Sequence, residues 1–236
     1  DELSKSNLLL EKQKVELQKV NSTKDKFFSI ISHDVRNPFS IILGYIDLLN
    51  QGYESMKQEK VRMYINEISF AANNVFKLLD NLLQWARAQR GLIKYQPEMH
   101  NLFVIADESI KLVDNTAQKK KINLISQVKK DTMVYADIDM VKLILRNLLN
   151  NALKYTNEGE VVISAINKNG GTDLMVSDTG VGINKDRLDS LFDPAKVKST
   201  KGTGGEKGTG LGLILCKEFV DMHKGSIKAK SQEGKG

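Results

Sequence analysis

The stretch NLLNNALKY, from Asn147 to Tyr155, decides how the second half of the chain folds. On a helix, Asn147, Asn151 and Lys154 share one face because they are spaced by four and three residues, and the intervening leucines supply the opposite, buried face. Amide oxygens suit Mg²⁺, a lysine suits phosphate, and the Tyr155 ring can lie against a purine. Taken alone, the same spacing is also typical of a solvated helix face.

A second block, DTGVGI, runs from Asp178 to Ile183 and follows the apolar run LMVS. Its glycines, Gly180 and Gly182, let the backbone turn tightly and approach a ligand closely. Asp178, at the end of the expected strand, could accept a hydrogen bond from an adenine amino group. A simple turn capped by aspartate is the alternative for this block by itself.

A third block, GTGLGL, runs from Gly208 to Leu213 and opens a helix. Backbone N–H groups at a helix N-terminus suit phosphate. The block is neither a Rossmann fingerprint nor a P-loop, because no strand immediately precedes it and no Lys followed by Ser or Thr closes it. The candidate phosphate-binding residues here are Gly208, Thr209, Gly210, Leu211 and Gly212.

Near the other end of the chain, HDVRNP runs from His33 to Pro38. Helical geometry places His33 opposite the apolar stripe, so we expect its ring to face solvent, where a neutral imidazole is a competent nucleophile. Asp34 is the candidate general base, and Asn37 lies one turn beyond on the same face. Pro38 predicts a kink just after the histidine. In an arbitrary helix, a solvated surface histidine would be the ordinary interpretation.

The composition indicates a folded protein without a membrane span. The 236 residues are 41% hydrophobic and carry a formal charge of +6, which suits polyanionic partners without choosing among them. No long apolar run or leader pattern is present, so we expect this fragment to be cytoplasmic. A membrane anchor elsewhere in the full-length protein is compatible with this expectation. The single cysteine, Cys216, lies in an apolar helical pattern and is expected to be a buried thiol.

The first ninety or so residues predict two long helices. Leu3, Leu10 and Leu17 recur every seven residues, which predicts a coiled coil over 1–22. The coiled coil runs into a long helix that reaches about Asn50. A break at 51–53 precedes a second amphipathic helix. Because one hairpin cannot bury both apolar stripes, we expect a homodimer with a four-helix bundle.

From Gly91 to Pro97 the helical period ends, and short strands alternate with helices. This pattern predicts an α/β sandwich, so the chain as a whole is α+β. Between Pro194 and Gly210, a run rich in Gly, Lys and Thr predicts a lid-like loop. The expected strands are 122–128, 132–136, 161–166, 174–177 and 226–230, and the expected helices are 102–117, 138–155 and 211–223.

The four blocks, in this order and spacing, resemble the sensor histidine kinases of two-component signalling, and the second half resembles the ATP-binding fold shared with Hsp90, DNA gyrase and MutL (the Bergerat or GHKL fold). The resemblance implies a signalling helix over 1–22, a dimerisation and phosphotransfer domain over 23–92, and a catalytic domain over 97–236. It also implies a further strand after the final EGKG stretch, an upstream sensor domain, and a response-regulator receiver domain as partner.

By the same resemblance, ATP and Mg²⁺ are the ligands. Asn151 would bind Mg²⁺ with help from Asn147, Lys154 would contact phosphate, Tyr155 would flank adenine, and Asp178 would read its amino group. His33 would accept the phosphoryl group, and Asn37 would support phosphatase activity. Phe192 matches the family's phenylalanine block, and Lys196 and Lys198 are basic lid residues.

Two alternatives to a kinase follow from the same residues. A conformational ATPase like Hsp90 or MutL would need a glutamate in place of Asn147 to activate water, and an amide cannot act as that base. A degenerate kinase would bind nucleotide, or nothing, and serve as a dimeric signalling scaffold. Nucleic-acid binding is disfavoured, because Lys119 to Lys121 form a short cluster without interleaved aromatic residues.

Overall fold

The computed structural model describes residues 2–168, 170–193, 200, 202–204 and 210–236. Within the first helix it does not describe the side chains of residues 2, 3, 5, 8, 9, 12 and 16–33. The chain divides into two compact units, residues 1–83 and 84–236.

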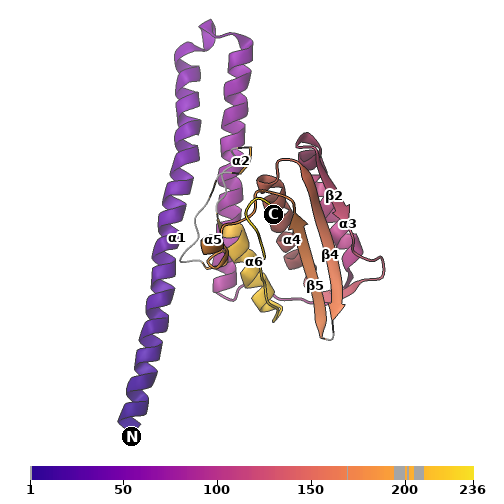
Figure 1. Cartoon of the computed structure of the whole chain (residues 1–236). Coiled ribbons are helices and arrows are strands. Elements are labelled where there is room, and N and C mark those ends of the chain that lie inside the picture. The colour runs from indigo at the N-terminus through magenta and orange to yellow at the C-terminus, as the bar shows by residue number, and fades with distance from the viewer. Residues whose placement is uncertain (1, 169, 194–199, 201, 205–209) are drawn as a thin grey trace. The chain divides into compact units, whose positions relative to one another are not determined.

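The first unit is a helical hairpin (Figure 1). Helix α1 (Glu2–Gly52) runs unbroken through Pro38 and leads through a short 3₁₀ turn, η1 (Tyr53–Ser55), into α2 (Gln58–Gln89). Inside the hairpin, the rings of Tyr45 and Tyr64 lie 4.9 Å apart, centroid to centroid. Over residues 34–52 of α1 and along α2, the less exposed residues recur at intervals of about three and four, as in an amphipathic helix. On α2 the buried residues are Tyr64, Ala71, Val75 and Leu78.

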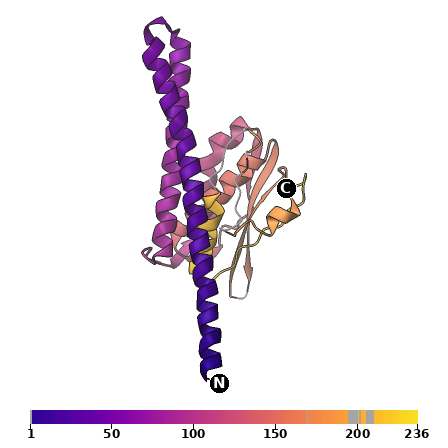
Figure 2. The ribbon, with the colours of Figure 1, turned by 90° about the vertical axis from the view of Figure 1, so that its left-hand side faces the viewer.

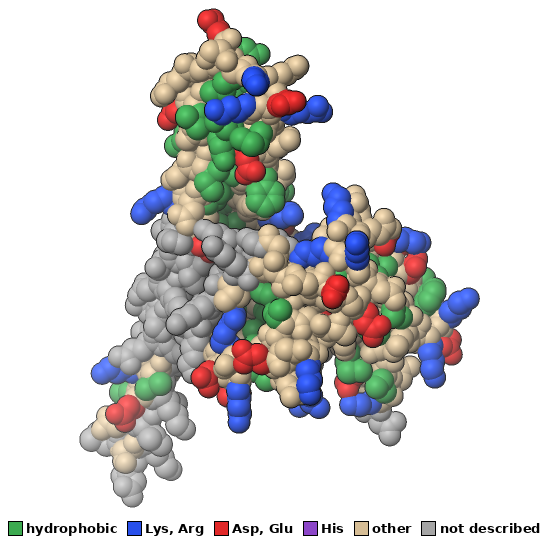
Figure 3. Space-filling view, turned by 45° about the horizontal axis from the view of Figure 1, so that its top comes forward, with side chains coloured by type: hydrophobic (Ala, Val, Ile, Leu, Met, Phe, Trp, Pro, Cys, Tyr) green, Lys and Arg blue, Asp and Glu red, His purple; other side chains and the backbone are tan. Residues whose placement is uncertain are grey.

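Much apolar surface of this hairpin is left open in the single chain. Phe70 and Phe76 on α2 are 60% and 72% exposed. Figure 3 shows apolar side chains gathered on the hairpin. A contiguous apolar surface of this kind marks an interface rather than a solvated face. The sequence expectation that one hairpin cannot bury both of its stripes agrees with this exposure.

The second unit is built on two small sheets. Strand β1 (Glu98–Asn101) pairs antiparallel with β3 (Met133–Ala136), with Met99 opposite Tyr135. In the other sheet, the order is β2 (Ile122–Ser126), β4 (Gly159–Lys168) and β5 (Gly171–Asp178). Strand β4 is parallel to β2 and antiparallel to β5, where Val161 stands opposite Asp178.

Helices cover one face of the larger sheet. Helix α3 (Leu102–Lys119) and helix α4 (Ile138–Tyr155) lie against it, and Figure 2 shows the sheet on one side of these helices. Asparagine and aspartate side chains cap their N-termini, Asn101 for α3 and Asp137 for α4. Alternate residues of β5 face the helices while the others are exposed, as in a sheet with one solvated face. Fully buried residues of this core include Leu102, Ile105, Leu145, Leu149, Val161 and Ile163.

A second core joins α4, α6 (Leu211–Met222) and the last turns of α2. Trp85 and Ala88 of α2 pack against a buried cluster that contains Leu215, Cys216 and Phe219. Cys216 is fully buried, as the sequence predicted, and burial raises the pKa of its thiol to about 12. The thiol is therefore a packing group rather than a reactive one.

The predicted α+β architecture and the predicted helices are confirmed, and three elements differ. Strand β1 was missed because EMHN lacks the β-branched residues that mark strands. The short helix α5 (Lys185–Leu188) was also missed. The strand expected over 226–230 was wrong, because that segment pairs with no strand among the described residues although its exposure alternates.

Candidate nucleotide and phospho-acceptor sites

The HDVRNP block lies within α1. Val35 and Pro38 are half-buried, as the helical spacing predicts, and Arg36 is exposed. Asp34 and Asn37 are also half-buried. The side chain of His33 lies outside the described residues, so the outward orientation of its ring stays a prediction. The candidate general base Asp34 and the candidate phosphatase residue Asn37 likewise keep their roles as predictions.

The end of α4 and the end of β5 meet at one point. The backbone N–H of Val181 donates to the Tyr155 carbonyl oxygen at 3.1 Å, which joins the two blocks directly. Between them lies Gly180, whose N–H donates to Asp178 Oδ1 at 3.0 Å. Thus Tyr155, Asp178 and Gly180, which the sequence placed in one site, are neighbours.

Asp178 is a half-buried acceptor with one carboxylate oxygen held by a backbone N–H. Burial raises the pKa of its carboxyl above the usual value, and the hydrogen bond from the Gly180 N–H acts in the opposite direction. A half-buried carboxylate at a strand end suits recognition of a hydrogen-bond donor such as an amino group. The geometry therefore fits the predicted adenine contact of Asp178.

Asn147 and Gly212 bring α4 against the first turn of α6. A methyl group at Gly212 would stand 2.9 Å from Asn147 Oδ1, so glycine lets that amide keep its present position. Gly210, the residue before α6, has φ of 71°, a left-handed conformation that favours glycine. The structure thus brings Gly212 to Asn147, while Leu211 is buried beneath the same turn. Gly208 and Thr209, and with them Lys196 and Lys198, lie outside the described residues.

At Gly182, both the backbone conformation and the close packing require glycine. Its φ is 70°, and a side chain there would collide with the carbonyl oxygen of Gln232. The neighbouring Ile183 N–H donates to Ser231 Oγ at 2.7 Å, so this part of the DTGVGI block holds the segment 231–236. The close packing accounts for the glycine, and its approach to a nucleotide stays a prediction.

The residue predicted to bind the metal, Asn151, is half-buried, and its side-chain amide forms no hydrogen bond with another described residue. The described residues hold no cluster of three or more His, Cys, Asp and Glu side chains. Amide oxygens together with phosphate oxygens are a donor set that suits Mg²⁺ without such a cluster. The residues present are therefore compatible with MgATP, and the metal-binding roles of Asn151 and Asn147 stay predictions.

Lys154 and Tyr155, both half-buried, contact Thr200. Lys154 Nζ donates to the Thr200 carbonyl oxygen at 2.7 Å and to the Tyr155 hydroxyl at 2.9 Å. The Tyr155 hydroxyl lies 3.0 Å from Thr200 Oγ1. Sequence reasoning did not single out Thr200, and only its place in the predicted lid between Pro194 and Gly210 pointed toward it.

Two further residues at this site were missed. Thr156 is fully buried, and its hydroxyl oxygen would stand 2.9 Å from a methyl group at Gly180. Lys120 Nζ donates to the Leu153 carbonyl oxygen at 2.9 Å. The sequence could not single out Lys120, because a run of three lysines, Lys119 to Lys121, gives no sign of which one turns inward.

Two family descriptions match the chain. Residues 23–91 match the His Kinase A (phospho-acceptor) domain, and residues 136–236 match the Histidine kinase-, DNA gyrase B-, and HSP90-like ATPase. The chain thus couples a phospho-acceptor hairpin to a nucleotide-binding domain. It belongs to the sensor histidine kinases of two-component signalling.

Similar proteins are longer than this chain. The "Non-motile and phage-resistance protein" of Caulobacter vibrioides is 29% identical over 232 residues, which are 96% of this chain and 28% of that protein. Sensor protein SrrB of Staphylococcus aureus is 27% identical over 218 residues, 92% of this chain and 37% of that protein. The chain therefore spans well under half the length of these relatives.

Solved structures share the fold. Histidine kinase ThkA in its complex with response regulator protein TrrA has a TM-score of 0.69 at 20% identity, over 93% of this chain and 61% of that chain. Full-length ShkA in complex with AMPPNP has a TM-score of 0.64 at 22% identity, over 89% of this chain and 43% of that chain. Within the described residues of the present chain, no helix is long and apolar enough to cross a membrane.

Proposed function

We propose that this chain is an autokinase core that transfers the terminal phosphoryl group of ATP to His33 and passes it to an aspartate on a response-regulator receiver domain. The observation that carries the proposal is the meeting of Tyr155, Gly180 and the half-buried Asp178 at the end of α4, in a chain whose α1 carries HDVRNP. A phospho-acceptor domain of this family implies a dimer, and the open apolar face of the hairpin supports one.

In this mechanism, a ring nitrogen of His33 attacks the terminal phosphorus, the new N–P bond replaces the P–O bond to ADP, and Asp34 accepts the proton from the other ring nitrogen. Lys154 would neutralise phosphate charge, and Asp178 would hold the adenine amino group. Bound Mg²⁺ would offset charge on the phosphate oxygens, with Asn151 and Asn147 as its protein neighbours. Positioning and charge neutralisation carry most of such a transfer.

Partner and location belong to the same proposal. The structure of ThkA was solved with the response regulator TrrA, and that of ShkA with AMPPNP, which supports a receiver domain and an adenine nucleotide as the partners of this chain. Both partners are found in the cytoplasm, where we place this part of the protein. Asn37 would position a water that attacks the phosphoryl group on the regulator aspartate and releases it as inorganic phosphate.

The test is incorporation of γ-labelled phosphate from MgATP as an acid-labile, base-stable adduct. We expect the wild type to be labelled and His33→Gln to remain unlabelled. His100→Gln is the matched control, because His100 lies on β1 in the other unit and has no assigned role. Labelling of His33→Gln at the wild-type level would remove His33 from the mechanism.

Two other outcomes separate the alternatives. Steady release of phosphate without labelled protein would favour a conformational ATPase, although an amide at Asn147 cannot serve as the base that activates water. Failure of the wild type to bind any adenine nucleotide with Mg²⁺ would favour the scaffold.

A further inference from the structure

Thr200 and Thr203 lie over the last turn of α4 and make different kinds of contact there. Thr200 contacts side-chain groups, namely the ammonium of Lys154 and the hydroxyl of Tyr155, and it also accepts from Arg187 Nη2 at 3.3 Å. Thr203 contacts mainly main-chain groups of α4: its N–H donates to the Lys154 carbonyl oxygen at 3.0 Å, and its hydroxyl lies 3.1 Å from the same oxygen. The two threonines therefore need separate explanations.

The contacts of Thr203 complete the C-terminus of the helix. The last carbonyl groups of any α-helix have no partner within the helix. Here Thr203 satisfies the carbonyl of Lys154, and Lys120 satisfies that of Leu153 while donating also to Thr203 Oγ1 at 3.3 Å. The ammonium of Lys120 further suits the negative end of the helix dipole. Thr203 and Lys120 thus form a structural anchor for α4.

The contacts of Thr200 instead occupy the groups assigned to the nucleotide. Two of the three N–H groups of Lys154 are taken, one by the Thr200 carbonyl oxygen and one by Tyr155. The same ammonium lies over the Tyr155 ring, 4.7 Å from its centroid. A phosphate oxygen at Lys154 and a purine on Tyr155 would each replace a contact that already exists.

We propose that Thr200 competes with the nucleotide for Lys154 and Tyr155, whereas Lys120 and Thr203 anchor the end of α4 and take no part in that competition. The proposal rests on the function proposed above. Nucleotide binding then requires Thr200 to leave Lys154 while Thr203 remains on α4. Only the fraction of protein in which Thr200 has left Lys154 can bind nucleotide, so the apparent affinity is the intrinsic affinity multiplied by that fraction.

The test compares the affinity for the magnesium complex of a non-hydrolysable ATP analogue, measured by calorimetry. Thr200→Val removes the hydroxyl that contacts Tyr155 and Arg187 but keeps the shape of the side chain. We expect roughly 3- to 10-fold tighter binding, from the loss of two ordinary hydrogen bonds of the competing state. In the labelling assay, the same variant should lower KM for ATP and leave kcat unchanged.

Two matched variants isolate the effect. Thr200→Ser keeps the hydroxyl and should bind like the wild type, and so should Thr172→Val, whose hydroxyl donates only to Asn167 Oδ1 on the β4–β5 hairpin. Unchanged or weaker binding by Thr200→Val, with a wild type that binds, would overturn the competition alone. A wild type that binds no adenine nucleotide would overturn the proposed function and the competition together.

The anchor has its own readout. Thr203→Val should lower the melting temperature of the nucleotide-free protein, because it removes the hydroxyl that contacts the Lys154 and Thr156 carbonyl oxygens and accepts from Lys120 Nζ. Thr200→Val should leave that temperature nearly unchanged. Equal losses of stability in the two variants would show that Thr200 is part of the structural cap and would overturn the division of roles.

Discussion

Gly180 lies so close to Tyr155 that a methyl group at Gly180 would stand 2.5 Å from the Tyr155 carbonyl oxygen. The same methyl would stand 2.8 Å from Asp178 Oδ1, so the collision involves both the helix end and the candidate adenine acceptor. The approach exists because Val181 N–H and Gly180 N–H fold the chain back onto these two groups.

We therefore expect Gly180→Ala to lower the free energy of unfolding of the second unit by about 1–3 kcal/mol, the usual cost of forcing a methyl into packed structure. Nucleotide affinity should fall as well, because Asp178 must move. Chemical denaturation and nucleotide titration measure the two effects. Gly171→Ala is the control, since a methyl there meets nothing within 4 Å. Equal stability of the two variants would contradict the packing described for Gly180.

Asp178→Asn separates recognition from stability. Burial raises the pKa of Asp178, so the ionised carboxylate costs the folded state free energy. The unfolded chain ionises near pH 4 and the folded one at a higher pH, so the wild type loses stability across that window as pH rises. We expect the asparagine variant to melt slightly higher than the wild type at pH 7, with no difference below about pH 4.

The same variant should bind nucleotide less well. Loss of a hydrogen bond to a charged acceptor lowers affinity by roughly 10- to 100-fold. Calorimetric titration with ATP and GTP measures this, and we expect only ATP binding to weaken. Full retention of ATP affinity in Asp178→Asn would exclude the carboxylate as the adenine reader, whatever the melting temperature shows.

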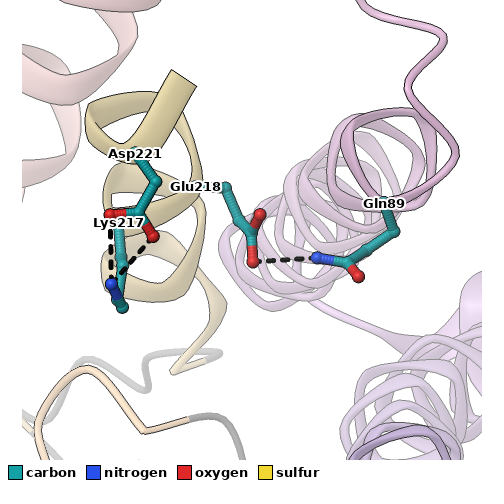
Figure 4. Close-up of polar contacts among 4 residues, drawn as sticks. All are labelled: Gln89, Lys217, Glu218 and Asp221. Atoms are coloured by element: carbon teal, nitrogen blue, oxygen red, sulfur yellow. Dashed lines mark hydrogen bonds and ion pairs between the residues drawn. The ribbon is translucent and has the colours of Figure 1, made fainter. Parts of the chain in front are cut away.

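Glu218 on α6 offers a test of electrostatics away from the nucleotide site. Figure 4 shows its carboxylate accepting a hydrogen bond from Gln89 Nε2, at 2.8 Å, beside the ion pair of Lys217 and Asp221. Burial is the main cause that raises the pKa of Glu218, and the negative charge of Asp221 adds to it. At a pH above the usual pKa of glutamate, the charged Glu218 carboxylate therefore lowers the stability of the folded protein.

Glu218→Gln should accordingly raise the melting temperature by about 1 °C at pH 7, a small effect because solvent screens this half-exposed group. The amide oxygen of the new side chain can still accept from Gln89. The gain should shrink as pH falls through the window just above 4, where the wild-type carboxyl becomes protonated. Glu233→Gln, on an exposed residue near the chain end, is the control. A gain that persists unchanged at pH 4 would contradict the electrostatic cause.

The sequence predicted the core of the fold because its signals are local. The bounds of α4 were predicted from helical spacing such as that of NLLNNALKY, and the cap that the structure shows at Asp137 is also a contact between neighbours in sequence. Strand β1 could not be predicted in this way, since EMHN becomes a strand only by pairing with β3, some 35 residues later. The segment 226–230 shows the reverse case: its alternating pattern is local, but a strand also needs a partner.

The candidate site divides along the same line. The sequence predicts that Asn151 and Lys154 share one helix face and that Asp178 ends a strand, because helix periodicity and strand ends can be recognised locally. It could not place Thr200, whose contacts join residues 45 or 46 positions apart in the chain. Nor could it distinguish Lys120 from the lysines on either side, because the carbonyl oxygen that Lys120 contacts, that of Leu153, lies 33 positions away in the chain.

Gly212→Ala provides a test in which stability and function should move apart. Replacing glycine by alanine in the first turn of α6 favours the helix by up to about 1 kcal/mol. The new methyl would stand 2.9 Å from Asn147 Oδ1, and the amide, which ends a flexible side chain, can rotate away. We therefore expect a melting temperature equal to or above that of the wild type.

Nucleotide binding by Gly212→Ala should weaken nevertheless, because the displaced Asn147 amide no longer stands beside Asn151 on the face assigned to Mg²⁺. The loss should be largest when the nucleotide is titrated with Mg²⁺ and small with the nucleotide alone, since the metal contact is the one disturbed. Asn147→Ala should reproduce the magnesium-dependent loss, and adding it to Gly212→Ala should cause little further change because both act on one contact. Independent, additive losses in the double variant would show that Gly212 acts on the nucleotide by its own backbone and not through Asn147.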